Sequence, residues 1–436
     1  MRWRNPGLFG LVLALSGSAL LAACSASEEG PTEPEDTTRS ASTPTDGGPG
    51  VAPIDGLAAT EIAAFYTGMA EFEKTVSDRD GLGPLFTEAS CAGCHTSAAR
   101  GPGATFKMAV VKADGITPLD DQSLLPFGNT QHPNLVGGTG ARTPILVPFE
   151  GTRDLGGSTG VVSVRVTKLL GPPLFGRGYL EAISDAEIER MAAQQAARTD
   201  GIRGRINRLP FISQPNPDPT FDAHRPGDTV IGRFGLKARI ATLDEFSADA
   251  LQADMGLTSP MRPAEFANPD GLADDLKPGV DVSAEQMNAR ASFTRLLAIP
   301  GRAPGAMNGR AWFENCSCNV CHEESLHTRA DYPVRKLADI DVAVFTDMLI
   351  HDMGDGLSDS IAHGNEGMAT SRDWRTAPLI GMRFNTTFMH DGRATNLRDA
   401  ILMHDTPGSE STPSAQCFER LAPKFQQQIL DFVGAL

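Results

Sequence analysis

Apolar residues recur with the period of a helix in several parts of the chain. The stretch from residue 57 to residue 77 places Leu57, Ile62, Phe65, Met69 and Phe72 at helical spacing. Three further helix starts are marked by a hydroxyl residue followed three positions later by Glu or Gln, the pattern of a capping box. These pairs are Ser184 with Glu187, Thr242 with Glu245, and Ser283 with Gln286.

The last part of the chain has the pattern of two further helices. Residues 308–318 lead into "CSCNVCH", and residues 423–436 begin with Pro423 and carry four apolar residues along one face. Residues 97–180 and 200–235 are instead rich in Gly, Pro, Thr and Val, which favours long loops and short strands. The predicted fold class is therefore mainly α, with long loops and short strands.

Two stretches share the spacing Cys-x-x-Cys-His: "CAGCH" at residues 91–95 and "CNVCH" at residues 318–322. In this spacing, two thiols one helical turn apart each add to a haem vinyl group, and the histidine ligates the iron. With 7 Cys and 9 His in 436 residues, two copies by chance are not expected. The alternatives are redox Cys-x-x-Cys motifs or a shared zinc site, and neither needs these histidines. The pattern predicts two covalently bound haem c groups, on Cys91, Cys94 and His95 and on Cys318, Cys321 and His322.

The positions of the helices around the second motif agree with a known arrangement. A helix before the motif and another at the chain end are typical of cytochrome c, where the two cross beside the haem. We therefore expect two cytochrome c-like haem domains. Residues 56–280 would form an N-terminal haem domain with loop-rich insertions, and residues 281–436 a C-terminal one.

The first residues have the features of an export signal. Two arginines precede an apolar run at residues 8–20, which is too short to span a bilayer. Leu21-Ala22-Ala23-Cys24 resembles a bacterial lipobox. Residues 1–23 therefore predict a lipoprotein signal peptide with lipidation of Cys24; the alternative is ordinary cleavage that leaves a plain thiol.

Residues 24–55 contain little that can be buried and predict a disordered tether. We thus expect an exported protein, lipid-anchored to the membrane at its periplasmic face. Ser25, rather than Asp, follows the lipobox cysteine, which favours the outer membrane.

Two cysteines, Cys316 and Cys417, are left over once lipid and haem are assigned. In an oxidising compartment two such residues tend to pair, so we expect a Cys316–Cys417 disulfide, with two free buried thiols as the alternative. The net charge of −16 becomes −18 after removal of residues 1–23, which contain two arginines. This charge argues against nucleic acid and favours a neutral or cationic small redox protein as electron donor.

Longer stretches occur in a familiar order: "GLGPLFTEASCAGCH", "GPPLFGRGYLEAI", "DGIRGRINR", "LIHDMGDGL" and "FMHDGRATNLRDAILMH". Together they resemble the bacterial di-haem oxidoreductases that are labelled peroxidases or thiol oxidoreductases, a group related to the di-haem cytochrome c peroxidases and MauG. The resemblance covers about residue 57 to residue 436. It implies that electrons enter at the C-terminal haem and that hydrogen peroxide reacts at the N-terminal haem.

The resemblance also implies a sixth ligand for the second haem, on the helix in "NLRDAILMH". Cytochrome peroxidases use methionine there, but the alignment places His404 at the ligand position, with Met403 as the alternative. His/His ligation gives a lower potential than His/Met ligation. His390, in the His-x-Gly turn, is expected to hydrogen-bond near the haem rather than to ligate it.

The distal side of the first haem is expected to be open, to hold a displaceable histidine, or to be permanently closed. His132 in "GNTQHPN" is a candidate distal ligand, and the alternative is that Gln131 beside it orients a bound peroxide. Glu181 matches the acid/base glutamate that moves a proton between the peroxide oxygens, with a surface position as the alternative. His351 occupies a recurring family position without an assigned role. The family also binds calcium through backbone oxygens. Solvent exposure is expected for His224, His327 and His363, and core packing for Trp312 and Trp374.

Three functions remain open at this point. The first is an enzyme that reduces hydrogen peroxide to water. The second is an electron-transfer cytochrome with both irons six-coordinate and no substrate. The third is a MauG-like oxidase of an organic or protein substrate. The label thiol oxidoreductase has no support in this chain, because every Cys-x-x-Cys pair is assigned to haem.

Overall fold

The structure of the protein is a computed structural model. It describes residues 50–436 except 97–102, 113–118, 120–124, 126–127, 137–150, 155–160, 267–271, 273–275, 304–306 and 360–365. The predicted signal peptide, Cys24, most of the predicted tether and His363 lie outside the described residues. The end of the predicted tether is ordered, because Ile54 is buried and its N–H donates to the Leu296 carbonyl at 3.0 Å.

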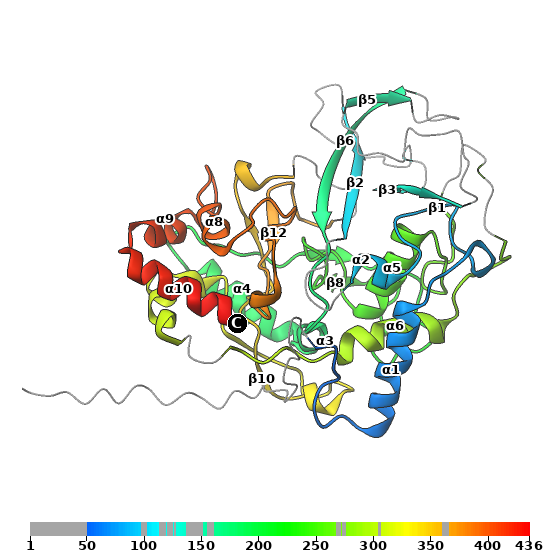
Figure 1. Ribbon diagram of the computed structural model, residues 1–436, viewed down its shortest axis with the longest axis horizontal. Coiled ribbons are helices and arrows are strands. Elements are labelled where there is room, and N and C mark those ends of the chain that lie inside the picture. The colour runs from blue at the N-terminus through cyan, green and yellow to red at the C-terminus, as the bar shows by residue number, and fades with distance from the viewer. Residues whose placement is uncertain are drawn as a thin grey trace, which may run out of the picture. The chain divides into compact units, whose positions relative to one another are not determined.

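The helices start where the capping patterns predict. The side chains of Ser184, Thr242 and Ser283 each accept a hydrogen bond from the backbone N–H three residues later. None of the helices in the described residues has the length and apolar character needed to cross a membrane. The α-helices of the described residues are α1 (Ala59–Glu73), α2 (Cys91–Cys94), α3 (Arg177–Ala182), α4 (Asp185–Ala196), α5 (Leu243–Met255), α6 (Ala284–Leu296), α7 (Arg310–Asn315), α8 (Leu397–Leu402), α9 (Thr412–Arg420) and α10 (Pro423–Ala435) (Figure 1).

The strands are antiparallel and make the fold mixed α and β rather than mainly α, which corrects the predicted class. The largest sheet has the order β3-β2-β6-β5, and β6 extends over ten residues, longer than the short strands expected (Figure 1). Its strands are β2 (Ala104–Val110), β3 (Thr130–Gln131), β5 (Gly151–Asp154) and β6 (Val161–Leu170). The two-stranded pairs are β1 (Leu85–Phe86) with β4 (Asn134–Leu135), β7 (Arg208–Pro210) with β8 (Thr229–Ile231), β9 (Ser325–His327) with β10 (Asp341–Ala343), and β11 (Ile350–Asp352) with β12 (Asp373–Arg375).

A pair of helices supports the first Cys-x-x-Cys-His stretch. Helix α1 packs along α6, and the two cross at Gly68, where an added Cβ would lie 2.1 Å from the Ala289 carbonyl oxygen (Figure 1). Phe65 and Phe72 of α1 contact Phe293 of α6 in the core. Because α6 also packs on α3 and α5, it belongs with the N-terminal elements. The predicted domain boundary at residues 280 and 281 separates α6 from these contacts, and it stays a prediction.

A second pair of helices supports the second stretch. Helix α7 crosses α10 at Gly309, where an added Cβ would lie 1.9 Å from the Gln428 carbonyl oxygen. Trp312 of α7 packs on Phe425 of α10, with ring centroids 4.0 Å apart. The predicted helix before the motif and the predicted C-terminal helix are thus both present and in contact.

Replacing Gly309 with alanine is expected to destabilise the protein by about 3 kcal/mol, because a methyl group cannot fit against the backbone of α10 without moving it. Thermal unfolding followed by circular dichroism measures the effect. Gly301→Ala is the matched control, since a Cβ there meets no atom within 4 Å. Equal melting temperatures for the two variants would contradict the close crossing.

Candidate functional site

The second Cys-x-x-Cys-His stretch holds its histidine with one ring nitrogen free. His322 Nδ1 lies 3.1 Å from the Phe345 carbonyl oxygen, which can only accept, so Nδ1 carries the proton. Burial lowers the pKa of His322 to about 4, and the charge of His404 contributes to this shift. The imidazole is therefore neutral at pH 7, and its Nε2 presents a lone pair, the form in which histidine ligates iron.

His404 lies just after α8 and has the same arrangement. Its Nδ1 lies 2.8 Å from the Ala400 carbonyl oxygen, which again leaves Nε2 free. Burial lowers the pKa of His404. The neighbouring Met403 packs among the apolar residues of the C-terminal core. The two histidines are thus close enough to interact electrostatically, each with an unprotonated Nε2, which favours His404 over Met403 as the second ligand.

The remaining cysteines beside this stretch are joined. Cys316 and Cys417 form a disulfide with an S–S distance of 2.06 Å, which links the end of α7 to α9. Cys318 and Cys321 are free thiols. This division matches the spacing, in which Cys316 is one residue out of register.

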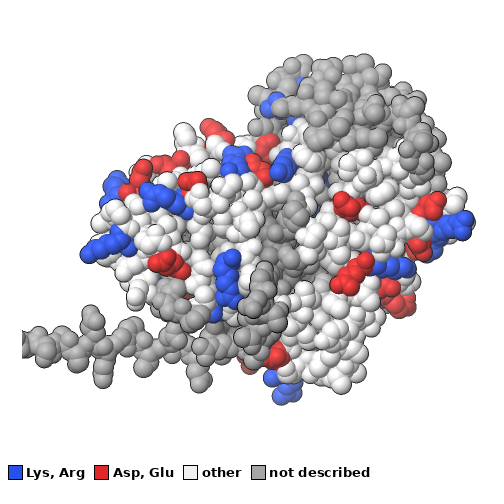
Figure 2. Space-filling model, viewed as in Figure 1, with Lys and Arg blue, Asp and Glu red and all other residues white. Residues whose placement is uncertain are grey.

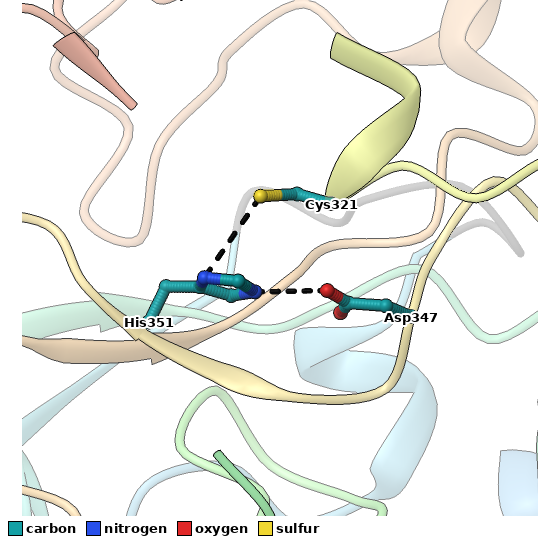
Figure 3. Close-up of side chains that lie close together, drawn as sticks. All are labelled: Cys321, Asp347 and His351. Carbon is teal, nitrogen blue, oxygen red and sulfur yellow. Dashed lines mark hydrogen bonds and ion pairs between the residues drawn. The ribbon is translucent and has the colours of Figure 1, made fainter. Parts of the chain in front are cut away.

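A buried ion-pair cluster lies beside Cys321 (Figure 3). His351 Nδ1 is 2.8 Å from Glu410 and 3.8 Å from Cys321 Sγ, and its Nε2 is 2.8 Å from Asp347. Burial alone would lower the pKa of His351, but the charges of Cys321 and Asp347 raise it well above its usual range. Both ring nitrogens donate to carboxylates, so the ring has no lone pair left for a metal. We assign His351 to this ion-pair cluster, which anchors the strand next to the motif.

The first Cys-x-x-Cys-His stretch forms α2, and its cysteines open onto a cavity. Ser90 caps α2 by accepting the Gly93 N–H at 3.0 Å. Cys91, Cys94 and His95 line a cavity of ≈ 220 Å³ together with residues of α5 and of the segment that follows β6. Burial lowers the pKa of His95 to about 4, with a contribution from the charge of Arg177. Its buried Nδ1 has no hydrogen-bond partner among the described residues.

The geometry weakens both alternatives to haem. Burial raises the pKa of Cys94 and of Cys318 to about 12, whereas a reactive Cys-x-x-Cys thiol has a lowered pKa. The one group of three metal-ligating side chains found among the described residues is Cys321, Asp347 and His351. Because it contains no residue of the first motif, the structure gives no support to a zinc site shared by the two motifs.

Three predicted active-site residues do not line this cavity. Glu181 is buried and accepts hydrogen bonds from Arg295 at 2.6 Å, Tyr332 at 2.6 Å and the Leu243 N–H at 2.7 Å. Its oxygens are thus occupied in joining α3, α5 and α6, which corrects the acid/base assignment. His132 is also buried, with Nε2 bonded to the Ala253 carbonyl oxygen at 2.8 Å. Gln131, on β3, is buried beside it.

The cavity wall contains charged residues that the sequence did not single out. Asp254, at the end of α5, has an Oδ1 with no hydrogen-bond partner and lies 3.9 Å from Lys107 Nζ. Burial raises its pKa, although Lys107 opposes the shift. Arg177 and Arg375 are buried in the same wall. Nothing in the local pattern marks these residues, because they come from separate elements.

The structure also describes the other aromatic and histidine residues that were singled out in the sequence. Trp312 packs in the core as expected, and His224 and His327 are part-exposed beside carboxylates. Trp374 is also buried, as expected; in addition it lines the cavity and stacks on His390, with ring centroids 3.8 Å apart and planes at 11°. The ring of His390 makes no hydrogen bond within the described residues, and its Nε2 lies 3.9 Å from Asp391 Oδ2. A hydrogen bond of this ring near the haem stays a prediction.

The two stretches therefore fit a protein that holds two haems. Each stretch has a part-buried neutral histidine one position after the second of two free thiols, and a second histidine, His404, is close enough to the second stretch to affect the pKa of His322. A family model described as "Di-haem oxidoreductase, putative peroxidase" matches residues 160–436. The chain belongs to this di-haem oxidoreductase family.

Other comparisons add little. The chain is similar to a structure of Kuenenia stuttgartiensis hydrazine synthase pressurised with 20 bar xenon, at 14% identity and a TM-score of 0.37. That alignment covers 99% of this chain and 100% of the other. A TM-score this low does not establish a shared fold. A comparison with curated proteins gives no match.

Proposed function

We propose that this protein is an exported di-haem c-type oxidoreductase that reduces hydrogen peroxide to water. Electrons enter at the C-terminal site, made by Cys318, Cys321 and His322, and peroxide reacts at the N-terminal site, made by Cys91, Cys94 and His95. The overall reaction joins one hydrogen peroxide, two electrons and two protons to give two waters.

The difference between the two sites is the observation that carries this proposal. The C-terminal site has two neutral imidazoles with free Nε2 atoms, His322 and His404, and these two residues would hold the iron of a haem bound there. The N-terminal site has His95 beside a cavity of ≈ 220 Å³, and neither His132 nor any other histidine of the described chain lines that cavity opposite it. Two candidate ligating histidines suit a site for electron transfer, and a single histidine beside a cavity suits a site that binds a substrate.

The chain's own residues supply the protons. A haem held by His95 would supply the electrons and the site at which peroxide is reduced. Asp254 borders the cavity and carries a raised pKa, so its carboxyl group can hold a proton and pass it to a peroxide oxygen. Lys107, 3.9 Å away and bonded to Thr130, holds the Asp254 side chain in place and favours recovery of its charge.

Export and lipid anchoring at Cys24 are part of the proposal. They are supported by the sequence of residues 1–24 and by the Cys316–Cys417 disulfide, since disulfides persist in oxidising compartments. A small redox protein is the expected electron donor. On the face shown in Figure 2, the acidic and basic side chains of the described residues are interspersed. The net charge therefore remains the argument for a neutral or cationic donor.

Low-temperature EPR with optical spectra of the purified di-haem protein tests the proposal. The protein is measured fully oxidised, half-reduced, and after one equivalent of peroxide. We expect one high-spin signal, at rest or on half-reduction, and rapid loss of peroxide. Two low-spin haems in both states, inert to peroxide, would leave an electron carrier. A high-spin haem that consumes peroxide only with an organic substrate would favour the oxidase alternative.

Asp254→Asn separates the proton role from folding. We expect it to slow peroxide reduction by about 10²-fold or more, with both haem spectra unchanged, since general acid–base groups contribute 10²- to 10⁴-fold. Asp331→Asn, which alters an exposed carboxylate, is the matched control. Equal rates for the two variants would exclude Asp254 as the proton donor.

A further inference from the structure

Two buried arginines in the wall of the N-terminal cavity form no ion pair with a described residue, although the charge of Asp347 acts on Arg375. Arg177, the first residue of α3, is 5% exposed, and Arg375, the last residue of β12, is 7% exposed. Both line the cavity. No carboxylate of a described residue lies within 4.0 Å of either guanidinium. Burying a charge without a partner is costly, so these two side chains require an explanation.

Two other buried arginines of the fold form ion pairs with carboxylates. Arg295 contacts Glu181 and Asp244, and Arg290 lies 3.0 Å from Glu71. These two and the pair in question are the four arginines that are buried among the described residues. Among the described residues, Arg290 and Arg295 thus have carboxylate partners, whereas Arg177 and Arg375 have none within 4.0 Å.

Arg177 and Arg375 each have N–H groups that are available to donate further hydrogen bonds. Arg177 donates Nε to the Pro173 carbonyl at 2.7 Å. Arg375 donates Nε to the Gly235 carbonyl at 3.3 Å and Nη1 to the Thr376 carbonyl at 2.9 Å. Both terminal nitrogens of Arg177 and Nη2 of Arg375 make no hydrogen bond in the described part of the chain. Carbonyl contacts orient these groups but do not neutralise them.

The two charges act on each other and on the motif. Burial lowers the pKa of Arg177 to about 9, and the charge of Arg375 contributes. Arg177 in turn lowers the pKa of His95. Arg375 pairs across the β11–β12 ribbon with Ile350, next to His351, whose ring contacts Cys321 Sγ. Arg177 thus acts on the histidine of the first stretch, and Arg375 lies opposite the neighbour of a residue that contacts the second.

We infer that Arg177 and Arg375 form a carboxylate-binding pair in the wall of the N-terminal cavity. A carboxylate offers two acceptor oxygens to the planar donors of a guanidinium, and its charge offsets the buried cation. The haem proposed on His95 brings two propionate carboxylates, so the inference rests on that part of the proposed function but not on peroxide reduction. A free carboxylate that enters the cavity is the other source of the same chemistry.

Redox titration of the purified di-haem protein tests the pair without using peroxide. Positive charges near a haem favour its reduced, less positive form, so Arg177→Gln and Arg375→Gln are each expected to lower the midpoint potential of the N-terminal haem alone. Haem content should stay at two, because attachment depends on the cysteines. The conservative Arg177→Lys and Arg375→Lys variants should retain most of the potential, which separates charge from folding. Arg208→Gln, an exposed arginine paired with Glu189, is the control.

The outcomes distinguish the two carboxylate sources. A lowered N-terminal potential supports the propionates. An unchanged potential, with a succinate-induced change in the wild-type haem spectrum that is lost in both glutamine variants, supports a free carboxylate. If the glutamine variants match the wild type in potential and in succinate response, the pair does not bind carboxylates. A wild-type protein that is inert to peroxide but shows the shifted potentials would overturn the proposed function and keep the inference.

Discussion

Replacing Cys318 and Cys321 with serine is expected to remove one of two covalently bound haems. Thioether attachment needs the two thiols, and serine hydroxyls do not add to the vinyl groups. The variant should therefore lose half of the haem signal on a haem-stained denaturing gel and half of the haem in a pyridine haemochrome assay. The same change at Cys91 and Cys94 should remove the other haem. Loss of both haems in one double variant would contradict independent sites.

The heptapeptide "CSCNVCH" contains its own control. Cys316 lies two positions before Cys318 but is joined to Cys417 rather than left free. Cys316→Ser with Cys417→Ser should keep both haems and lower stability by about 4 to 5 kcal/mol, as expected for a disulfide that closes a loop of 101 residues. Loss of a haem from this variant, with retention in Cys318→Ser and Cys321→Ser, would reverse the assignment of the three cysteines.

The parts of the fold predicted correctly are those that depend on neighbours in sequence. Ser184, Thr242 and Ser283 cap helices because each cap is completed within four residues. The crossing of α7 and α10 followed from two amphipathic patterns beside a haem motif. The role of Cys316 followed from its register, and its pairing from the small number of cysteines left over.

The parts predicted wrongly, or not predicted, depend on contacts between distant residues. Nothing in the sequence of α6 shows that Gly68 of α1 allows the two helices to approach closely, so this contact was not predicted. Glu181 was assigned to catalysis from its place in a motif. Its actual partner Arg295 lies 114 residues away, and Tyr332 lies 151 residues away. Such a network becomes visible only when α3, α5 and α6 are assembled.

The charged residues of the cavity wall also depend on contacts between distant residues, which the sequence does not reveal. Arg177, Arg375 and Asp254 resemble ordinary charged residues in sequence, and many of these are paired on the surface. In the structure, Arg177 and Arg375 are buried without a carboxylate within 4.0 Å among the described residues. Asp254 lines the cavity, and its Oδ1 has no hydrogen-bond partner among these residues. Sequence can reveal the residues that attach a haem, whereas the residues that surround it depend on how the chain closes.

Replacing His404 with methionine is expected to raise the midpoint potential of the C-terminal haem by at least about 0.1 V, because axial ligands tune haem potentials over about 0.8 V. Replacing it with alanine should instead turn a low-spin haem into a high-spin one. Added imidazole should restore the low-spin form, since it supplies the missing ligand. Redox titration and EPR of the oxidised protein measure both effects.

The adjacent Met403 provides the matched control. Met403 packs against the C-terminal core, whereas His404 has a free Nε2, so Met403→Leu should leave the potential and the spin state unchanged. Because burial lowers the pKa of both histidines, to about 4 for His322, protonation should not displace them above about pH 5. The low-spin signal should therefore persist from pH 8 to about pH 5. A spectrum that changes in Met403→Leu and not in His404→Ala would show methionine to be the ligand and remove the basis for a low-potential entry site.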